Sequence, residues 1–282
     1  MIPSAFSYER ATSLNDAAAR LAGGGKILAG GHSLLPLMKL RLSEPPRLID
    51  IARIPELHGI READGQIAIG AATTHHDVAT SPMLAAHCPV LAQAAATIGD
   101  QQVRNRGTIG GSLAHADPSA DYPAVLLALG AEVQLVSARG HRTVRIDDFF
   151  RDLFTVDLAA DEIIAAVHVK PAQTAAYAKL SQRASHYAIV GVAAAIELDK
   201  GTIASARIGL TGASSHARRL TNVEQALARR PANEETIAAA ANVAAAGVEN
   251  VNGDIHGSEA YRRAMIGVFT RRALNAALAR GQ

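Results

Sequence analysis

The chain carries Ala29-Gly30-Gly31-His32-Ser33 and, nearly eighty residues later, Thr108-Ile109-Gly110-Gly111-Ser112. In each segment an apolar residue leads into two adjacent glycines, and a serine follows. Glycine lets backbone N–H groups approach an anion closely, and the hydroxyls of Ser33 and Thr108 can add donors. Either segment alone is also typical of an ordinary tight turn. Together they predict two loops that hold a diphosphate.

Composition indicates a globular protein and excludes several kinds of site. The 282 residues are 49% hydrophobic, which is enough for two domains with apolar cores. The 28 basic and 26 acidic residues leave a net charge of +2 and are spread along the chain, so we expect no nucleic-acid partner. Cys88 is the single cysteine, which excludes an internal disulfide, a cysteine zinc site or an iron–sulfur cluster held by this chain. The sequence has neither a signal-peptide pattern at its start nor a transmembrane segment, so we expect a cytoplasmic protein.

The first part of the chain is predicted to form short elements around the two loops. Ser13 is typical of a helix cap, and apolar residues continue at helical spacing to Leu21. The other expected elements are strands at 26–29 and 47–51, a hairpin over 60–71 around Asp64-Gly65, helices opening at Thr73 and Ser81, a hairpin over 131–150 around Arg139-Gly140, and a strand at 163–169. Residues 1–56 and 57–173 are then two subdomains.

The pattern changes after Pro171, which predicts a domain boundary near residue 173. Strands at 177–180, 189–198 and 203–210 predict a three-stranded antiparallel sheet, and helices are expected at 220–230, 233–248 and 258–279. The expected elements therefore include both helices and strands in each part of the chain.

Two arginine pairs lie on the last expected helix, at Arg262-Arg263 and Arg271-Arg272. They could dock an acidic partner. We instead expect a solvated basic face opposite a core stripe. That stripe is Tyr261, Met265, Val268 and Ala273.

Other candidate motifs are incomplete. Gly23-Gly24-Gly25-Lys26 lacks the first glycine and the Ser or Thr of a phosphate-loop ATPase motif, and no G-x-G-x-x-G follows the first strand. His75 and His76 lack the carboxylate spacing of a metal site. Ser112, His115 and Asp117 lack the G-x-S-x-G elbow of a hydrolase triad. We therefore predict no metal site and no catalytic triad in this chain.

The segment that follows the second loop, Leu113 to Asp121 (LAHADPSAD), makes the pair of loops more specific. The loops and this segment resemble the flavin-diphosphate loops of the FAD-binding medium subunit of molybdenum hydroxylases, the carbon monoxide dehydrogenase and xanthine dehydrogenase family. Leu34-Leu35-Pro36 and Arg104-Asn105-Arg106-Gly107 are similar to the carbon monoxide dehydrogenase branch. Ser112 departs mildly from the asparagine of many members. The resemblance extends along essentially the whole chain, including Tyr261-Arg262-Arg263-Ala264 near its end.

The resemblance implies a PCMH-type fold, in which FAD lies extended between the two α+β subdomains of residues 1–173. A C-terminal domain, residues 174–282, then covers the isoalloxazine end. The positions carried over to the diphosphate loops are Leu28, Ala29, Gly30, Gly31, His32, Ser33 and Leu34, with Thr108, Ile109, Gly110, Gly111 and Ser112. Asp121 corresponds to an acceptor for the adenosine part. Ile98, Ile164 and Lys179 correspond to positions that line the cofactor, and Tyr187 to one near the flavin ring.

The same resemblance implies an electron-transfer subunit whose chemistry belongs to non-covalent FAD. In the family, a large subunit oxidises the substrate at Mo-molybdopterin and a small subunit relays electrons through [2Fe–2S] clusters. FAD then delivers the electrons to an external acceptor such as quinone. A dimer of heterotrimers in the cytoplasm, or at the inner face of the membrane, is expected. Carbon monoxide is the expected substrate of the complex.

Three alternatives differ from this interpretation. The chain could be a self-contained PCMH flavin oxidoreductase, a non-catalytic nucleotide-binding protein, or the medium subunit of a xanthine, aldehyde or aromatic hydroxylase. A self-contained oxidase needs a substrate domain larger than residues 174–282. A purified protein without yellow flavin would indicate the non-catalytic alternative.

Overall fold

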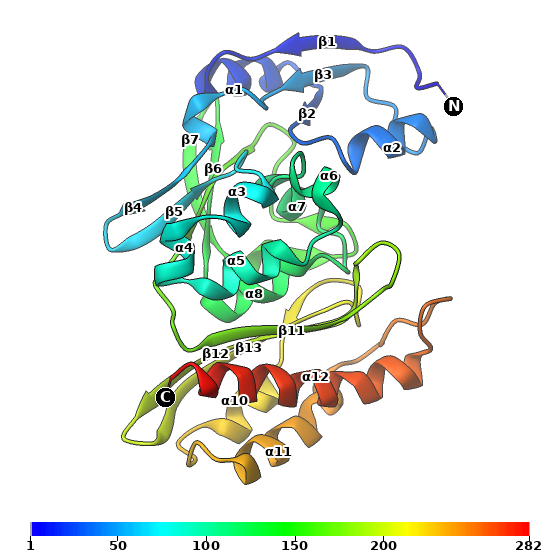
Figure 1. Ribbon diagram of the computed structural model, residues 1–282. Coiled ribbons are helices and arrows are strands. Elements are labelled where there is room, and N and C mark those ends of the chain that lie inside the picture. Colours follow the sequence, from blue (N-terminus) through cyan, green and yellow to red (C-terminus); the bar gives the residue numbers. More distant parts are fainter. Residues whose placement is uncertain (1, 282) are drawn as a thin grey trace.

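A computed structural model describes residues 2–281 and has the predicted α+β fold, with three main sheets stacked along the molecule (Figure 1). The strands are β1 (Ser7–Arg10), β2 (Lys26–Leu28), β3 (Arg47–Asp50), β4 (Ile60–Ala63), β5 (Gln66–Gly70), β6 (Glu132–Ser137), β7 (Gly140–Arg145), β8 (Phe150–Asp152), β9 (Thr155–Val156), β10 (Ile163–Val169), β11 (Ala175–Ser181), β12 (Ala188–Asp199), β13 (Thr202–Thr211) and β14 (Arg218–Arg219). The α-helices are α1 (Leu14–Ala22), α2 (Leu34–Lys39), α3 (His75–Ala79), α4 (Pro82–His87), α5 (Pro89–Ala96), α6 (Gln101–Arg104), α7 (Ile109–His115), α8 (Asp121–Leu129), α9 (Ile146–Phe149), α10 (Thr221–Leu227), α11 (Glu234–Val243) and α12 (Glu259–Ala279). Short 3₁₀ turns occupy Pro55–Leu57 and Ala244–Gly247.

The first sheet is parallel, with the strand order β1-β3-β2. The α1 helix begins as expected, because the Ser13 hydroxyl accepts a hydrogen bond from the Asp16 N–H at 3.1 Å. In this part of the chain, the sequence analysis missed the strand β1 and the helix α2. The strand β1 is largely exposed at a sheet edge, and α2 has a proline in its interior at Pro36, so neither shows the usual apolar pattern.

The second sheet is antiparallel, in the order β4-β5-β10-β6-β7. Both expected hairpins are present, and Asp64 and Gly65 have positive φ angles of 52° and 73°, which suit the tight turn between β4 and β5. Helices α3, α5, α7 and α8 pack on this part of the chain around one apolar core that contains Leu91, Leu113 and Tyr122.

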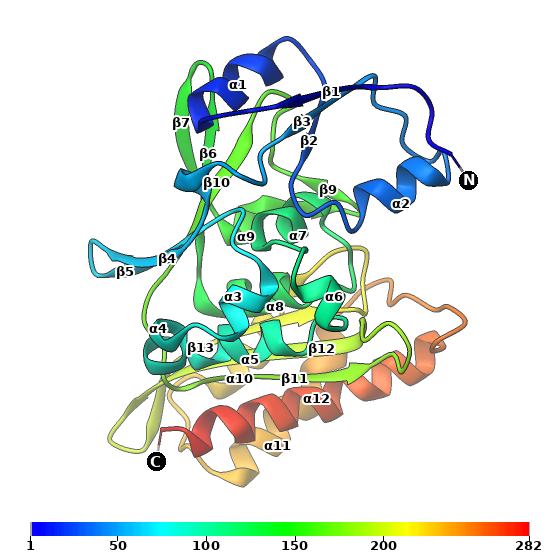
Figure 2. The same cartoon turned by 45° about the horizontal axis from the view of Figure 1, so that its top comes forward.

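The third sheet is antiparallel with the order β11-β12-β13-β14, so it has four strands where three were expected. The extra strand, β14, is only two residues long, which is too short for a recognisable strand pattern in the sequence. The sheet lies between α8 on one side and α12 on the other (Figure 2). Gly209 makes this packing possible, because a Cβ there would lie 2.0 Å from the Ala124 carbonyl oxygen. The C-terminal domain is therefore pressed directly against the flank of α8.

The three C-terminal helices form, but α11 ends at Val243 and continues as a 3₁₀ turn. The expected solvated face on α12 is wrong at Arg262, whose side chain is buried and donates to the Ile189 carbonyl at 2.6 Å and to Asp254 at 2.6 Å. Tyr261 and Val268 of the expected core stripe are exposed instead. Ile266, Phe269, Ala273 and Leu274 form the buried face. The two arginine pairs therefore do not share one surface.

Candidate functional site

A cavity of about 680 Å³ lies where the three-stranded sheet, the five-stranded sheet and the C-terminal domain meet. Its volume falls in the range of sites for small ligands and cofactors. Most of the lining residues lie in four stretches of chain, within residues 29–34, 107–115, 154–164 and 185–187. Both predicted glycine loops therefore face one cavity.

The first loop presents backbone donors. Within residues 2–281, the N–H groups of Gly30, Gly31, His32 and Ser33 make no hydrogen bond to the chain. Gly31 has φ +78°, a conformation that favours glycine, and a Cβ on Gly30 would lie 2.1 Å from the Arg106 carbonyl oxygen. The loop is thus held against the chain just before the second loop, with its donors free. Such a set of free N–H groups is suited to an anion.

The second loop differs from the expectation, because its backbone donors are already used. The N–H of Ile109 donates to Thr73 at 3.1 Å and that of Gly110 to Ala71 at 2.9 Å. The N–H of Gly111 donates to the Thr108 hydroxyl at 3.1 Å. Since the acceptors lie on the chain before α3 and at Thr108, these three N–H groups are paired within the chain and hold the loop in place. Its contribution to the cavity is the bare face of Gly111 and the hydroxyls of Thr108 and Ser112.

Ser33 occupies the N-cap position of α2 but makes no side-chain cap hydrogen bond. Its hydroxyl is therefore available to a ligand in the cavity. We expect Ser33→Ala to weaken cofactor binding by about 1 kcal/mol, or roughly fivefold, as for one lost hydrogen bond. Titration of the cofactor-free protein with FAD, followed by flavin fluorescence, measures this. Unchanged affinity would mean that the hydroxyl does not contact the cofactor.

Asp121, Lys179 and Tyr177 form a buried polar cluster between the two domains. The Lys179 ammonium lies 2.9 Å from an Asp121 carboxylate oxygen, and the Tyr177 hydroxyl donates to the same oxygen at 2.6 Å. The Lys179 and Asp121 side chains are 5% and 4% exposed. Burial raises the pKa of the Asp121 carboxyl, and the Lys179 charge and Tyr177 hydroxyl oppose that rise.

This contact brings together two residues that were expected at different parts of the cofactor. The resemblance assigned Asp121 to the adenosine part and Lys179 to a position near the flavin, and the structure places their side chains in direct contact. Lys179 also donates to the carbonyls of Thr97 and His186 at 2.9 and 2.7 Å, and it does not line the cavity. Its contacts are those of a residue that holds the cavity wall together.

The other expected residues divide into two groups. The cavity is lined by Ala29, Gly30, Gly31, His32, Ser33, Leu34, Ile98, Thr108, Gly110, Gly111, Ser112, Asp121, Ile164 and Tyr187. Leu28 and Ile109 are not among its lining residues, and the Ile109 side chain is fully buried in the core. The half-exposed Tyr187 ring stands at the C-terminal-domain end of the cavity.

Several lining residues were missed by the sequence analysis. They include His75, His115, Phe154 and the run from Leu158 to Ala160. The sequence analysis considered His75 only as part of a metal motif and His115 only as part of a hydrolase triad. Phe154 and residues 158–160 belong to irregular chain, so no periodic pattern marks them.

Burial lowers the pKa of His75 from 6.5 to about 4, and the nearby positive charges of His32 and Arg104 lower it as well. The ring lies 5.3 Å from that of Tyr122, and its Nδ1 has no hydrogen-bond partner among the described residues. A histidine held neutral in the fold must take up a proton when the chain unfolds near pH 5. Stability from this residue is therefore complete above pH 6.5 and is lost as the pH falls toward 4. We expect a loss of about 3 kcal/mol over that interval.

The comparison of wild type with His75→Asn in urea unfolding at a series of pH values tests this expectation. The variant should lack the added pH dependence between 6.5 and 4. Parallel curves for both proteins would contradict it.

A cavity of this size, with free N–H donors at one loop and apolar residues in its walls, is suited to a nucleotide cofactor. Residues 4–172 match the family model for the FAD binding domain in molybdopterin dehydrogenase. Residues 175–277 match the CO dehydrogenase flavoprotein C-terminal domain.

Similar proteins match this chain along its whole length. The chain is 42% identical to the carbon monoxide dehydrogenase medium chain of Hydrogenophaga pseudoflava, over 99% of both proteins. A solved carbon monoxide dehydrogenase from that organism matches with a TM-score of 0.95 and 43% identity over 99% of each chain. The 6-hydroxypseudooxynicotine dehydrogenase complex subunit alpha of Paenarthrobacter nicotinovorans is 41% identical, over 100% of this chain and 97% of the relative. The chain therefore belongs to the FAD-binding medium subunits of the molybdenum hydroxylases, where it is the FAD-carrying, electron-transferring part of an oxidoreductase.

The residues of the cavity fit FAD. Free N–H groups in the first loop suit its diphosphate, and the open face of Gly111 leaves room that a side chain would fill. Apolar residues such as Ile98, Ile164 and Leu158 suit its ring systems. No helix among residues 2–281 is both long and apolar enough to cross a membrane.

Proposed function

We propose that this chain passes electrons from the [2Fe–2S] clusters of a small subunit, through FAD in the described cavity, to an external acceptor. The large subunit of the complex oxidises carbon monoxide at Mo-molybdopterin. The free N–H groups of Gly30, Gly31, His32 and Ser33 carry the proposal for this site, because they have no acceptor among the described residues and all four residues line the cavity. Whole-chain similarity to a carbon monoxide dehydrogenase medium chain supports the choice of substrate.

The protein's own part in this function is to hold and orient the cofactor. FAD, when bound, supplies the redox chemistry. The first loop binds the diphosphate through backbone N–H groups, and Thr108 and Ser112 add hydroxyls. The Asp121–Lys179 pair fixes the C-terminal domain beside the cavity, so that Tyr187 lies at one end.

A second substrate class is supported by relatives that are almost as similar to this chain as the carbon monoxide dehydrogenase medium chain. The 6-hydroxypseudooxynicotine dehydrogenase subunit is 41% identical, and the solved quinoline 2-oxidoreductase of Pseudomonas putida 86 matches with a TM-score of 0.92 and 35% identity over 100% of both chains. In this alternative the large subunit hydroxylates an N-heteroaromatic compound. The role of the present chain is the same in both, since the substrate meets a different subunit.

Anaerobic mixing of the reconstituted complex with carbon monoxide, or with quinoline, distinguishes the two substrates. We expect the visible flavin absorption to bleach with carbon monoxide only when all subunits are present. Bleaching of the complete complex by quinoline, and not by carbon monoxide, would indicate the second substrate class. Bleaching of this chain by either substrate without partners would overturn the electron-transfer role.

For the assembly we propose a dimer of heterotrimers in the cytoplasm or at the inner face of the membrane, with quinone as acceptor. Relatives described as medium chains and complex subunits support a multi-subunit complex. Native mass spectrometry should give two copies each of the large, medium and small subunits. Reoxidation of the reduced complex by a soluble quinone tests the acceptor.

We predict that the FAD is held without a covalent bond. Cys88 is buried in the core and does not line the cavity, so its thiol cannot reach the flavin. Precipitation with acid should release all the yellow colour into the supernatant. A pellet that stays yellow would contradict the prediction and direct attention to the cavity histidines.

A further inference from the structure

One wall of the cavity is irregular chain. Residues 157–162 join β9 to β10, and Leu158, Ala159, Ala160 and Glu162 of this segment face the cavity. Two of its backbone hydrogen bonds are local, from Leu158 to Val156 and from Glu162 to Ala159. The one that leaves the neighbourhood is the Asp157 N–H to the Phe149 carbonyl at 2.8 Å. Backbone pairing alone therefore leaves this wall weakly fixed.

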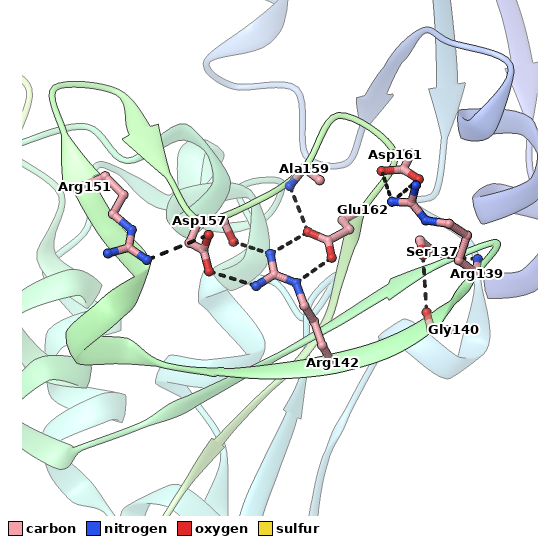
Figure 3. A network of polar contacts seen from close by, with 9 residues as sticks. All are labelled: Ser137, Arg139, Gly140, Arg142, Arg151, Asp157, Ala159, Asp161 and Glu162. Carbon is pink, nitrogen blue, oxygen red and sulfur yellow. Dashed lines mark hydrogen bonds and ion pairs between the residues drawn. The ribbon is translucent and has the colours of Figure 1, made fainter.

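Arg142 ties both ends of that segment to the sheet (Figure 3). It projects from the edge strand β7, and its Nε and Nη2 donate to the two Glu162 carboxylate oxygens at 2.6 and 2.7 Å. Its Nη1 donates to the Asp157 carboxylate at 2.8 Å, and Nη2 also donates to the Asp157 carbonyl at 3.0 Å. A planar guanidinium matches two such acceptors with little loss of side-chain freedom.

The middle of the segment depends on the same ion pair. The Ala159 N–H donates to the Glu162 carboxylate at 2.8 Å, so the carboxylate that Arg142 holds also sets the backbone at the cavity face. The Glu162 side chain is 10% exposed and the Arg142 side chain 41% exposed, and the hydrogen bond from Arg142 lowers the pKa of the Glu162 carboxyl. Arg142 itself does not line the cavity.

We propose that Arg142 is a positioning residue for FAD: it sets the shape of the wall at residues 157–162 and so raises the affinity for the cofactor without touching it. The inference rests on the proposed assignment of FAD to this cavity. A preformed wall spares the cofactor the cost of ordering the segment when it binds. Loss of Arg142 therefore weakens binding, while the sheet beneath keeps its fold.

The test uses the purified complex, stripped of FAD and titrated with FAD while flavin fluorescence is followed. Arg142→Ala should raise the FAD dissociation constant by about tenfold, the scale of lost charge-assisted hydrogen bonds. Arg142→Lys should recover part of the affinity, because an ammonium keeps the charge but cannot bridge four acceptors. Adding Asp157→Asn to Arg142→Ala should raise the dissociation constant little further, since both substitutions remove the same contact between Arg142 and the Asp157 carboxylate.

Arg139→Ala is the matched control. Arg139 lies in the same hairpin and its side chain is 2.9 Å from the Asp161 carboxylate of the same segment, but it is 76% exposed and forms an ion pair with Asp161 alone among residues 2–281. Its loss should change the dissociation constant less than twofold. Thermal unfolding separates positioning from a general structural role: without FAD, both variants should have similar Tm values, and only Arg142→Ala should lose part of the Tm rise that FAD produces.

Wild-type affinity in Arg142→Ala, or an equal loss in Arg139→Ala, would overturn the inference. So would a lower Tm without FAD and an unchanged dissociation constant. Gly111→Val serves as the reference for the site. If it too binds FAD normally, the cavity assignment fails and the role of Arg142 fails with it.

Discussion

Replacing Lys179 with methionine is expected to destabilise the folded chain by about 3–5 kcal/mol, because it leaves a buried carboxylate without its cation. Asp121 is 4% exposed, and its remaining partner would be the Tyr177 hydroxyl. The Thr97 and His186 carbonyls would lose a shared donor as well. Thermal and urea unfolding measure the loss. If the fraction of Lys179→Met that still folds retains its flavin, the result supports a role for Lys179 in holding the two domains together.

Lys170→Met is the control, since Lys170 is an exposed lysine close to the link between the domains. It should change stability by less than about 0.5 kcal/mol. The double variant Lys179→Met with Asp121→Asn should be more stable than Lys179→Met alone, because the unpaired charge is gone. A single variant as stable as wild type would show that the pair contributes nothing to folding.

The second large effect concerns Gly111, where a branched side chain should abolish FAD binding and leave the fold in place. The ideal Cβ meets one atom within 4 Å, the Thr108 hydroxyl oxygen at 2.8 Å, and beyond it lies the cavity. In Gly111→Val the methyl groups would occupy space assigned to the diphosphate. The disturbed Thr108 cap should cost only about 1 kcal/mol. Flavin per chain, measured by absorbance, should fall to background while circular dichroism stays native.

The neighbouring glycine supplies a contrast. A Cβ on Gly110 would lie 2.5 Å from the Ala71 Cβ and 2.8 Å from its carbonyl oxygen. Gly110→Val should therefore fail to fold, whereas Gly111→Val folds without flavin. If Gly111→Val retained a full complement of FAD, the second loop could not be part of the binding site.

Local chemistry made much of the fold predictable. Asp64-Gly65 and Arg139-Gly140 mark hairpins through residues that accept unusual backbone angles, and Ser13 marks a helix start. The exposed edge strand β1 and the two-residue β14 exist only through pairing with distant strands, so no local pattern announces them. Arg262 was misjudged for the same reason, because the carbonyls that receive it lie on other elements.

The sequence predicted the location of the site better than it predicted which of its groups are free to bind a ligand. The two glycine loops do face one cavity, but which of their N–H groups are free depends on acceptors at Ala71 and Thr73. The wall at residues 157–162 owes its shape to Arg142 on another strand. Long-range partners of this kind leave no trace in the spacing of a single sequence.

The buried contact of Asp121 with Tyr177 and Lys179 has a consequence for biosynthesis. Asp121 belongs to the segment that the ribosome makes first, and both of its partners lie more than fifty residues later. Until Lys179 has left the ribosome, the nascent chain holds an uncompensated acid beside the future cavity. We expect the cofactor to be loaded only after the second domain has been made.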